Sequence, residues 1–292
     1  MQKLPFRLYR DHLIITTGSL GDLQNRNLLI DTGANPTVVD EALVHELGLK
    51  SIAGPHSNLK IVGGAVPAYY AILQSLDLGP IHRESLTVAI ANLSLMQAQV
   101  GVRIDAIIGL DAIEPDNFEI DYESRKISFG DIRASSPVPM LRANPFVVVK
   151  TEVNGATLDL AVDTGTSELV LFRDEMPGSS VSLQGSNEIP LSNVAGDMTA
   201  TEVQVTNLKV GKKALNKSTA VLASAGQCCT FQGMLGVSAA QFRRVSFDFQ
   251  HGLVGLELPI RDLASGLMVS PCQGTFAGTP CGRAVLSGFS RP

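Results

Sequence analysis

The sequence predicts a mainly β protein built from two similar halves. Short runs rich in Val, Ile, Leu and Thr, separated by Gly, Asn and Pro, have the length and composition of strands. Clear examples are residues 12–20, 26–33, 145–153 and 157–165. The sequence also contains an internal repeat, whereas helical periodicity is rare. Because aromatic residues make up only 5% of the 292 residues and Trp is absent, the core must consist largely of Val, Leu, Ile and Ala.

The composition indicates a folded globular protein of about two domains. Hydrophobic residues make up 45% of the chain and charged residues 17%, which disagrees with a disordered or collagen-like chain. The net charge is -5, and no run of Lys or Arg could neutralise a stretch of phosphates. We therefore expect no nucleic acid partner.

No window approaches the roughly 18 continuous apolar residues that a membrane helix needs, so no membrane span is expected. The first residues, MQKLPFRLYRDHLII, have neither the apolar core nor the cleavage site of a signal peptide. A mature secreted protein would look the same, so the localisation stays open.

An internal repeat is the most informative feature of the sequence. LLIDTGANPTVV and LAVDTGTSELVLF align Asp31 with Asp163, and the same offset superposes residues 62–68 on residues 194–200. Further on, AIIGLDAI aligns with GMLGVSAA, and FEIDYESRKISF aligns with VSFDFQHGLVGL, at an offset five residues shorter. A length change confined to one stretch is what a surface loop tolerates.

The repeat suggests the domain organisation. We expect an N-terminal lobe at residues 1–134, a C-terminal lobe at 140–258 and a tail at 259–292 that is rich in Gly, Ser and Pro. The linker between the lobes is ASSPVP, in which two prolines discourage both helix and sheet. The tail is expected to be poorly ordered or loosely docked.

The strongest helical pattern is VVDEALVHELGLK. Val39, Leu43, Val44 and Leu47 would share one face of a helix, and Gly48 offers a stop.

Each half carries Asp-Thr-Gly directly after an apolar strand, at Asp31-Thr32-Gly33 and at Asp163-Thr164-Gly165. A carboxylate at the end of a hydrophobic strand faces desolvation, so its charge needs hydrogen-bond donors. The Gly permits a tight turn whose backbone N–H groups can approach the carboxylate. One such motif is a weak signal, but two in register are a strong one.

This repeated motif resembles the aspartic proteases, in which each of two lobes or subunits contributes one such loop to a shared acid dyad. The resemblance covers nearly all of residues 13–258. It implies an all-β fold of two pseudo-symmetric retropepsin-like or pepsin-like lobes. The stretch DTGANPTVVDEALVHELGL resembles bacterial retropepsin-like proteins, where the loop leads into a helix.

The resemblance implies further site residues. The family threads two apolar residues and a Gly behind each active loop. The flap hairpins of the retroviral dimer correspond to Gly63 and Gly64 in one half and to Gly196 in the other. The residues behind the active loops are Ile107, Ile108 and Gly109 in the first half and Met234, Leu235 and Gly236 in the second.

The implied activity is that of an aspartic endopeptidase, a hydrolase, with Asp31 and Asp163 as the catalytic pair. Thr32 and Thr164 would brace the two loops, and no metal or cofactor is needed. The partner would be a polypeptide substrate in extended conformation, and the protein would be active as a monomer. Two alternatives remain open, namely a catalytically weak peptide-binding module and a self-processing enzyme cut in its linker or tail.

The two active loops differ after the Gly. Ala34 follows Gly33, whereas Thr166 follows Gly165 and could donate a hydrogen bond to the neighbouring carboxylate.

The four cysteines show no metal-ligand spacing. Cys228 and Cys229 are expected to be buried as small apolar residues, although an oxidant-sensitive site stays possible. Cys272 and Cys281 are either free thiols or a disulfide that closes a small loop.

Overall fold

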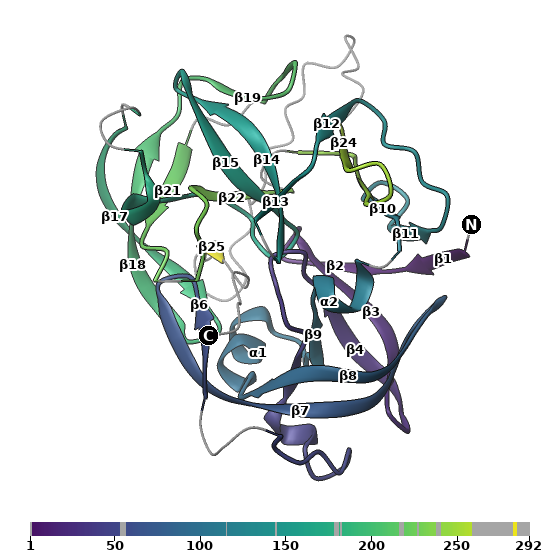
Figure 1. Ribbon diagram of the computed structural model, residues 1–292. Helices are drawn as coiled ribbons and strands as arrows, with labels where there is room; N and C mark the ends of the chain where they lie inside the picture. Colours follow the sequence, from purple (N-terminus) through teal and green to yellow (C-terminus); the bar gives the residue numbers. More distant parts are fainter. Residues whose placement is uncertain are drawn as a thin grey trace.

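The computed structural model describes residues 2–52, 57–114, 116–143, 145–177, 181, 183–215, 219–226, 228–237, 241–258 and 283–284. Within these residues the strands form three sheets, of six, eight and eleven strands. Figure 1 shows strands of the eight-stranded sheet in purple and blue and those of the eleven-stranded sheet in teal and green. The predicted all-β fold class is confirmed.

The eight-stranded sheet belongs to the first half of the chain. Its order is β2-β3-β4-β9-β5-β8-β7-β6, in which β4 pairs with β9 in parallel and β5 pairs with β9 antiparallel. Its strands are β2 Arg7–Tyr9, β3 Leu13–Leu20, β4 Leu23–Ile30, β5 Val38–Asp40, β6 Ser57–Ile61, β7 Gly64–Leu78, β8 Ile81–Ala91 and β9 Ala106–Ile108.

The eleven-stranded sheet repeats this pattern in the second half. The path β14-β15-β22-β16-β21-β18-β17 matches β3-β4-β9-β5-β8-β7-β6 pair by pair, including the parallel pairs β15–β22 and β16–β21. The internal repeat of the sequence is therefore a repeat of the fold. The strands are β13 Leu141–Ala143, β14 Phe146–Val153, β15 Ala156–Asp163, β16 Leu169–Phe172, β17 Gln184–Asn193, β18 Gly196–Gln204, β19 Leu208–Val210, β20 Lys213–Ala214, β21 Thr219–Ala223, β22 Gly233–Gly236 and β25 Arg283–Ala284.

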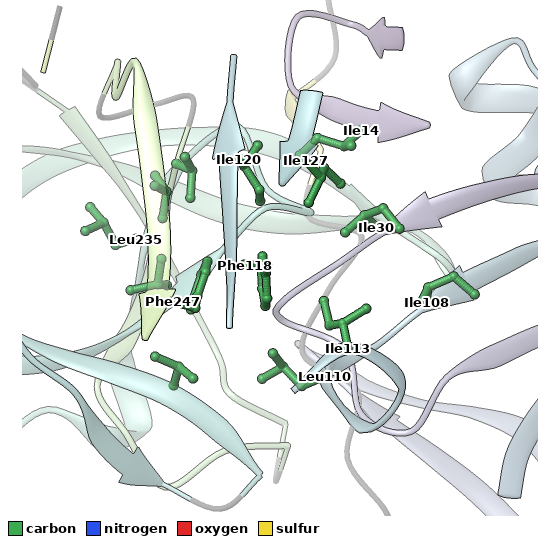
Figure 2. Close-up of a cluster of buried hydrophobic side chains, with 14 of the residues drawn as sticks. Ile14, Ile30, Ile108, Leu110, Ile113, Phe118, Ile120, Ile127, Leu235 and Phe247 are labelled. Atoms are coloured by element: carbon green, nitrogen blue, oxygen red, sulfur yellow. The ribbon is translucent and has the colours of Figure 1, made fainter. Parts of the chain in front are cut away.

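The six-stranded sheet, ordered β1-β11-β10-β23-β24-β12, joins the two halves. At its centre β10 pairs with β23, which places Phe118 opposite Phe247. The two rings stack with centroids 4.6 Å apart, and Figure 2 shows them side by side in a shared core. Both halves thus bury apolar residues in one cluster. The strands are β1 Gln2–Pro5, β10 Phe118–Asp121, β11 Lys126–Phe129, β12 Pro137–Pro139, β23 Arg244–Asp248 and β24 Leu253–Glu257.

The predicted helix around residues 39–48 is wrong. Val38–Asp40 instead forms β5, which lies between β8 and β9, and turns follow up to Gly48. Pairing on both edges outweighs the helical periodicity, because the strand buries Val38 and Val39 completely. The helical segments in the described residues are η1 Glu41–Leu43, α1 Ser94–Val100, α2 Leu110–Ile113 and η2 Arg173–Glu175.

The expectation that the linker avoids sheet structure is also wrong. Pro137–Pro139 forms β12 and pairs with β24 through Val138, opposite Val254. The strand lies at the edge of the six-stranded sheet, where proline's missing N–H costs no ladder bond.

Most of the predicted tail lies outside the described residues, as do Cys272 and Cys281. Arg283–Ala284 pairs in parallel with β17, opposite Leu191 and Ser192. Cys228 and Cys229 are buried as expected, and they form a disulfide with each other.

Candidate active site

Each Asp-Thr-Gly loop leaves the end of a buried strand. Asp31 follows β4 and Asp163 ends β15, and each of these strands lies beside a parallel partner, β9 or β22. The Asp31 N–H donates to the Ile108 carbonyl at 3.0 Å, and the Val237 N–H donates to the Asp163 carbonyl at 3.1 Å. The two aspartates therefore occupy equivalent places in the two halves.

The apolar-Gly residues lie directly behind these loops. Ile107 and Ile108 belong to β9, and Met234, Leu235 and Gly236 belong to β22. A Cβ on Gly109 would lie 2.5 Å from the Ala34 carbonyl oxygen, and one on Gly236 would lie 2.6 Å from the Glu168 carbonyl oxygen. Each Gly is thus required because the active loop packs against its Cα.

Thr32 and Thr164 link the two loops to each other. The Thr32 hydroxyl donates to the Val162 carbonyl at 2.8 Å and accepts from the Thr164 N–H at 3.1 Å. The Thr164 hydroxyl donates to the Ile30 carbonyl at 3.0 Å and accepts from the Thr32 N–H at 3.0 Å. Four buried hydrogen bonds therefore hold the N-terminal and C-terminal loops side by side.

Both carboxyl groups are fully buried, with 0% exposure of Asp31 and of Asp163. Oδ1 of Asp31 accepts from the Gly33 N–H at 2.8 Å, and Oδ1 of Asp163 accepts from the Gly165 N–H at 2.7 Å. The second oxygen, Oδ2, is buried in both residues. Two acidic groups thus lie in matching cradles on adjacent loops.

The residues that follow the two Gly differ in their contacts. Ala34 is buried, and its carbonyl accepts from the Leu110 N–H at 2.9 Å. Thr166 is equally buried, and its hydroxyl accepts from the Glu168 N–H at 3.1 Å.

The expected flap glycines lie at two hairpin turns. Gly63 lies in the turn between β6 and β7, Gly64 begins β7, and Gly196 begins β18 after the turn from β17. Gly63 has φ +82° and Gly196 has φ +117°, a region that favours glycine. The tips approach each other, since a Cβ on Gly63 would lie 2.5 Å from Cε of Met198.

Two features of the site were not expected from the sequence. The Thr37 N–H and hydroxyl both donate to the Asp111 carboxylate, and the Thr37 hydroxyl accepts from the Gly109 N–H at 3.1 Å. Asn193 bonds the tip of the other hairpin. The sequence held a signal for each: Asp111 is a charged residue within the apolar run AIIGLDAI, and Asn193 is a polar residue at the position that the repeat aligns with Ile61.

His12 lies close enough to Glu168 of the second active loop to interact with its charge. It is only 3% exposed, its Nδ1–H donates to the Arg10 carbonyl at 2.7 Å, and Nε2 has no hydrogen-bond partner among the described residues. Burial lowers the pKa of His12 below its usual 6.5, and the hydrogen bond to Arg10 and the charge of Glu168 oppose this only in part.

This buried imidazole predicts a loss of stability in acid. Below pH 6.5 the unfolded chain takes up a proton at His12 that the folded chain does not, so the free energy of unfolding falls as the pH drops towards the folded pKa. His12→Asn keeps a donor for the Arg10 carbonyl and should reduce the loss between pH 7 and pH 5 by about 1 kcal/mol. Urea unfolding at both pH values measures it, with the exposed His45→Asn as control; equal losses in parent and His12→Asn would contradict it.

A family comparison agrees with this geometry. The sequence model of a family described as aspartyl protease matches residues 16–112 and 149–239. The chain belongs to the aspartyl protease family. Each matched segment contains one of the two Asp-Thr-Gly loops, in agreement with two fused aspartyl protease lobes. No curated protein matches the chain.

None of the helices in the described ranges is long and apolar enough to cross a membrane. Among the same residues, no group of three or more His, Cys, Asp or Glu side chains could hold a metal ion.

Proposed function

We propose that this aspartyl protease family member is an endopeptidase that hydrolyses extended polypeptides with Asp31 and Asp163 as its catalytic pair. The observation that supports this most is the set of four hydrogen bonds that Thr32 and Thr164 make between the two acidic loops at the junction of the halves. Two of them join the threonines to each other, and two go to the Val162 and Ile30 carbonyls. Because one chain supplies both loops, we propose that it acts as a monomer. The lobes would be residues 1–134 and 140–258.

The chemistry follows from two buried carboxyl groups on adjacent loops. Ionising both would place two negative charges in a medium of low dielectric, so the pair would share one proton. The ionised carboxylate would take a proton from a water molecule, and the protonated one would polarise the scissile carbonyl. Attack by the water gives a tetrahedral diol with no covalent bond to the protein, and a proton returned to the amide nitrogen releases the amine.

The two hairpins would cover the substrate. Their strands can offer backbone hydrogen bonds to a peptide in extended conformation, and closure would exclude bulk water from the carboxyl pair. A peptide-binding module with the same hairpins but weak chemistry is the alternative. The complete set of two Asp, two Thr and two Gly favours catalysis.

Incubation with a denatured protein mixture between pH 3 and pH 7 tests the proposal. The parent should cleave the mixture, while Asp31→Asn and Asp163→Asn should each lower the rate about a thousandfold or more. An Asn amide can neither take a proton from the water as a base nor carry the shared proton as an acid. Equal cleavage by all three proteins would indicate a contaminant. Binding of peptide by the parent without cleavage would favour the binding module.

The difference between Ala34 and Thr166 gives a further prediction. A hydroxyl at position 34 can donate to the ionised carboxylate on that side, which makes ionisation easier. Ala34→Ser should therefore shift the acid limb of the pH–rate profile to lower pH. An unchanged or higher optimum in kcat/KM would contradict the prediction, and a thermal melt of the variant would check that this buried position accepts the hydroxyl.

A further inference from the structure

The tips of the two hairpins are buried in opposite halves of the molecule. We call residues 57–68 flap 1 and residues 184–200 flap 2. Val62 at the tip of flap 1 is 0% exposed and packs in a cluster of the second half with Phe146 and Cys228. Val194 at the tip of flap 2 is 6% exposed and packs in a cluster of the first half with Leu29. In Figure 1 the β6 strand of flap 1 lies next to β18 of flap 2.

Close backbone packing supports the crossed arrangement. Gly226, at φ +63°, lies against flap 1, since a Cβ there would be 2.4 Å from the Gly64 nitrogen. On the other side, a Cβ on Gly196 would lie 3.2 Å from a methyl group of Leu95 in α1. Each tip therefore rests on a surface of the opposite half.

One buried side chain connects the two tips. Asn193, 5% exposed, donates from Nδ2 to the Val62 carbonyl of flap 1 at 3.0 Å, and its Oδ1 accepts from the Ala195 N–H of flap 2 at 2.8 Å. A backbone N–H can only donate and a carbonyl can only accept, so these two partners fix the orientation of the amide. The repeat aligns Asn193 with Ile61, whose side chain has no polar group. Flap 2 therefore donates this hydrogen bond to flap 1, and Ile61 of flap 1 cannot make the equivalent one to flap 2.

Separate movement of either flap would be costly. Lifting flap 1 alone would leave the Val62 carbonyl and the Asn193 amide without each other, and it would expose Val62. If flap 2 moves with flap 1, the hydrogen bond survives the movement.

We propose that Asn193 is a positioning residue that couples the two flaps, so that they open as one unit. This proposal rests on the proposed function in one respect, namely that the flaps cover the substrate. The movement of the flaps is measured without substrate, so a failure of the coupling is distinct from a failure to hydrolyse peptides.

The test is amide hydrogen exchange, followed by mass spectrometry at pH 7.5, of peptides from flap 1 and flap 2. Asn193→Asp keeps the acceptor for Ala195 but places an oxygen against the Val62 carbonyl, so it removes the contact between the flaps selectively. We expect exchange at the flap 1 turn to rise about five- to tenfold, the factor that one lost hydrogen bond gives. The unfolding midpoint of Asn193→Asp is measured beside that of the parent, so that a general loss of stability is distinguished from the loss of this one contact.

The matched control is the neighbouring Ser192→Ala. Its hydroxyl bonds Asp197 within flap 2, so this variant loses a contact inside flap 2 and keeps the bond to flap 1. Exchange in flap 1 should stay at the parental rate.

Coupling must be reciprocal, which gives a second variant from the other side. Val62→Ala loosens flap 1 and should raise exchange at the flap 2 turn in the parent, but not in the Asn193→Asp background. Exchange that rises only within the mutated flap, in either variant, would overturn the proposal. If Asn193→Asp does not fold, exchange at the flap 2 turn in Val62→Ala alone tests the coupling. A rise there supports the proposal, and an unchanged rate overturns it.

Discussion

Replacing Thr164 by Val is expected to lower the free energy of unfolding by about 3 kcal/mol and kcat/KM for a peptide substrate by about a hundredfold. Val has nearly the shape of Thr, so little packing is lost. The Thr32 N–H and the Ile30 carbonyl, however, both lose their partner in a buried place. An unpaired buried group costs about 1–3 kcal/mol, and the two active loops would no longer be held in register.

Thr164→Ser separates the hydrogen bonds from the methyl group. Because Ser retains the hydroxyl, this variant should keep most of the stability and most of the activity. Urea unfolding together with a peptide-cleavage assay measures both effects. If Thr164→Val and Thr164→Ser behaved alike, the cross-loop hydrogen bonds would not be what aligns the site.

Gly236→Ala is expected to destabilise the protein by about 3 kcal/mol and to abolish measurable cleavage. The added Cβ would lie 2.6 Å from the Glu168 carbonyl oxygen and 2.7 Å from that of Thr166. Both atoms belong to the backbone of the loop that carries Asp163, so the clash can only be relieved by moving that loop.

Gly64→Ala is the matched control for stability. No heavy atom lies within 4 Å of a Cβ at Gly64, and its backbone is outside the left-handed region. Thermal or urea unfolding should show a change of less than about 1 kcal/mol for Gly64→Ala. A similar loss in both variants would mean that the tight packing behind the second active loop is not the cause.

The sequence predicted the parts of the fold that repeat. Two Asp-Thr-Gly motifs at one offset implied two equivalent sheets, and the strand orders of the eight-stranded and eleven-stranded sheets agree pair by pair. Local patterns predicted less well where long-range pairing decides the outcome. Val38 and Val39 fit a helix by periodicity, yet β8 and β9 on either side make them a strand.

The candidate site shows the same division. The aspartates, threonines and glycines of the loops could be selected because the Asp-Thr-Gly motif occurs twice in register, and the resemblance to the aspartic proteases implied the contact between the two threonines. The Asp111 contact with Thr37 and the Asn193 contact with Val62 join residues 74 and 131 positions apart. Such pairs depend on how the sheets fold over each other, and a single sequence contains little information about that.

The pairing of Pro137–Pro139 with β24 affects how the chain would respond to a cut between its halves. A protease needs its substrate as a free extended strand, and this segment is already engaged along one side. A nick there would require local fraying first. After such a nick, the β10–β23 contact and the stacked phenylalanines would still hold the two fragments together, so the break would be visible on a denaturing gel while the native particle kept its size.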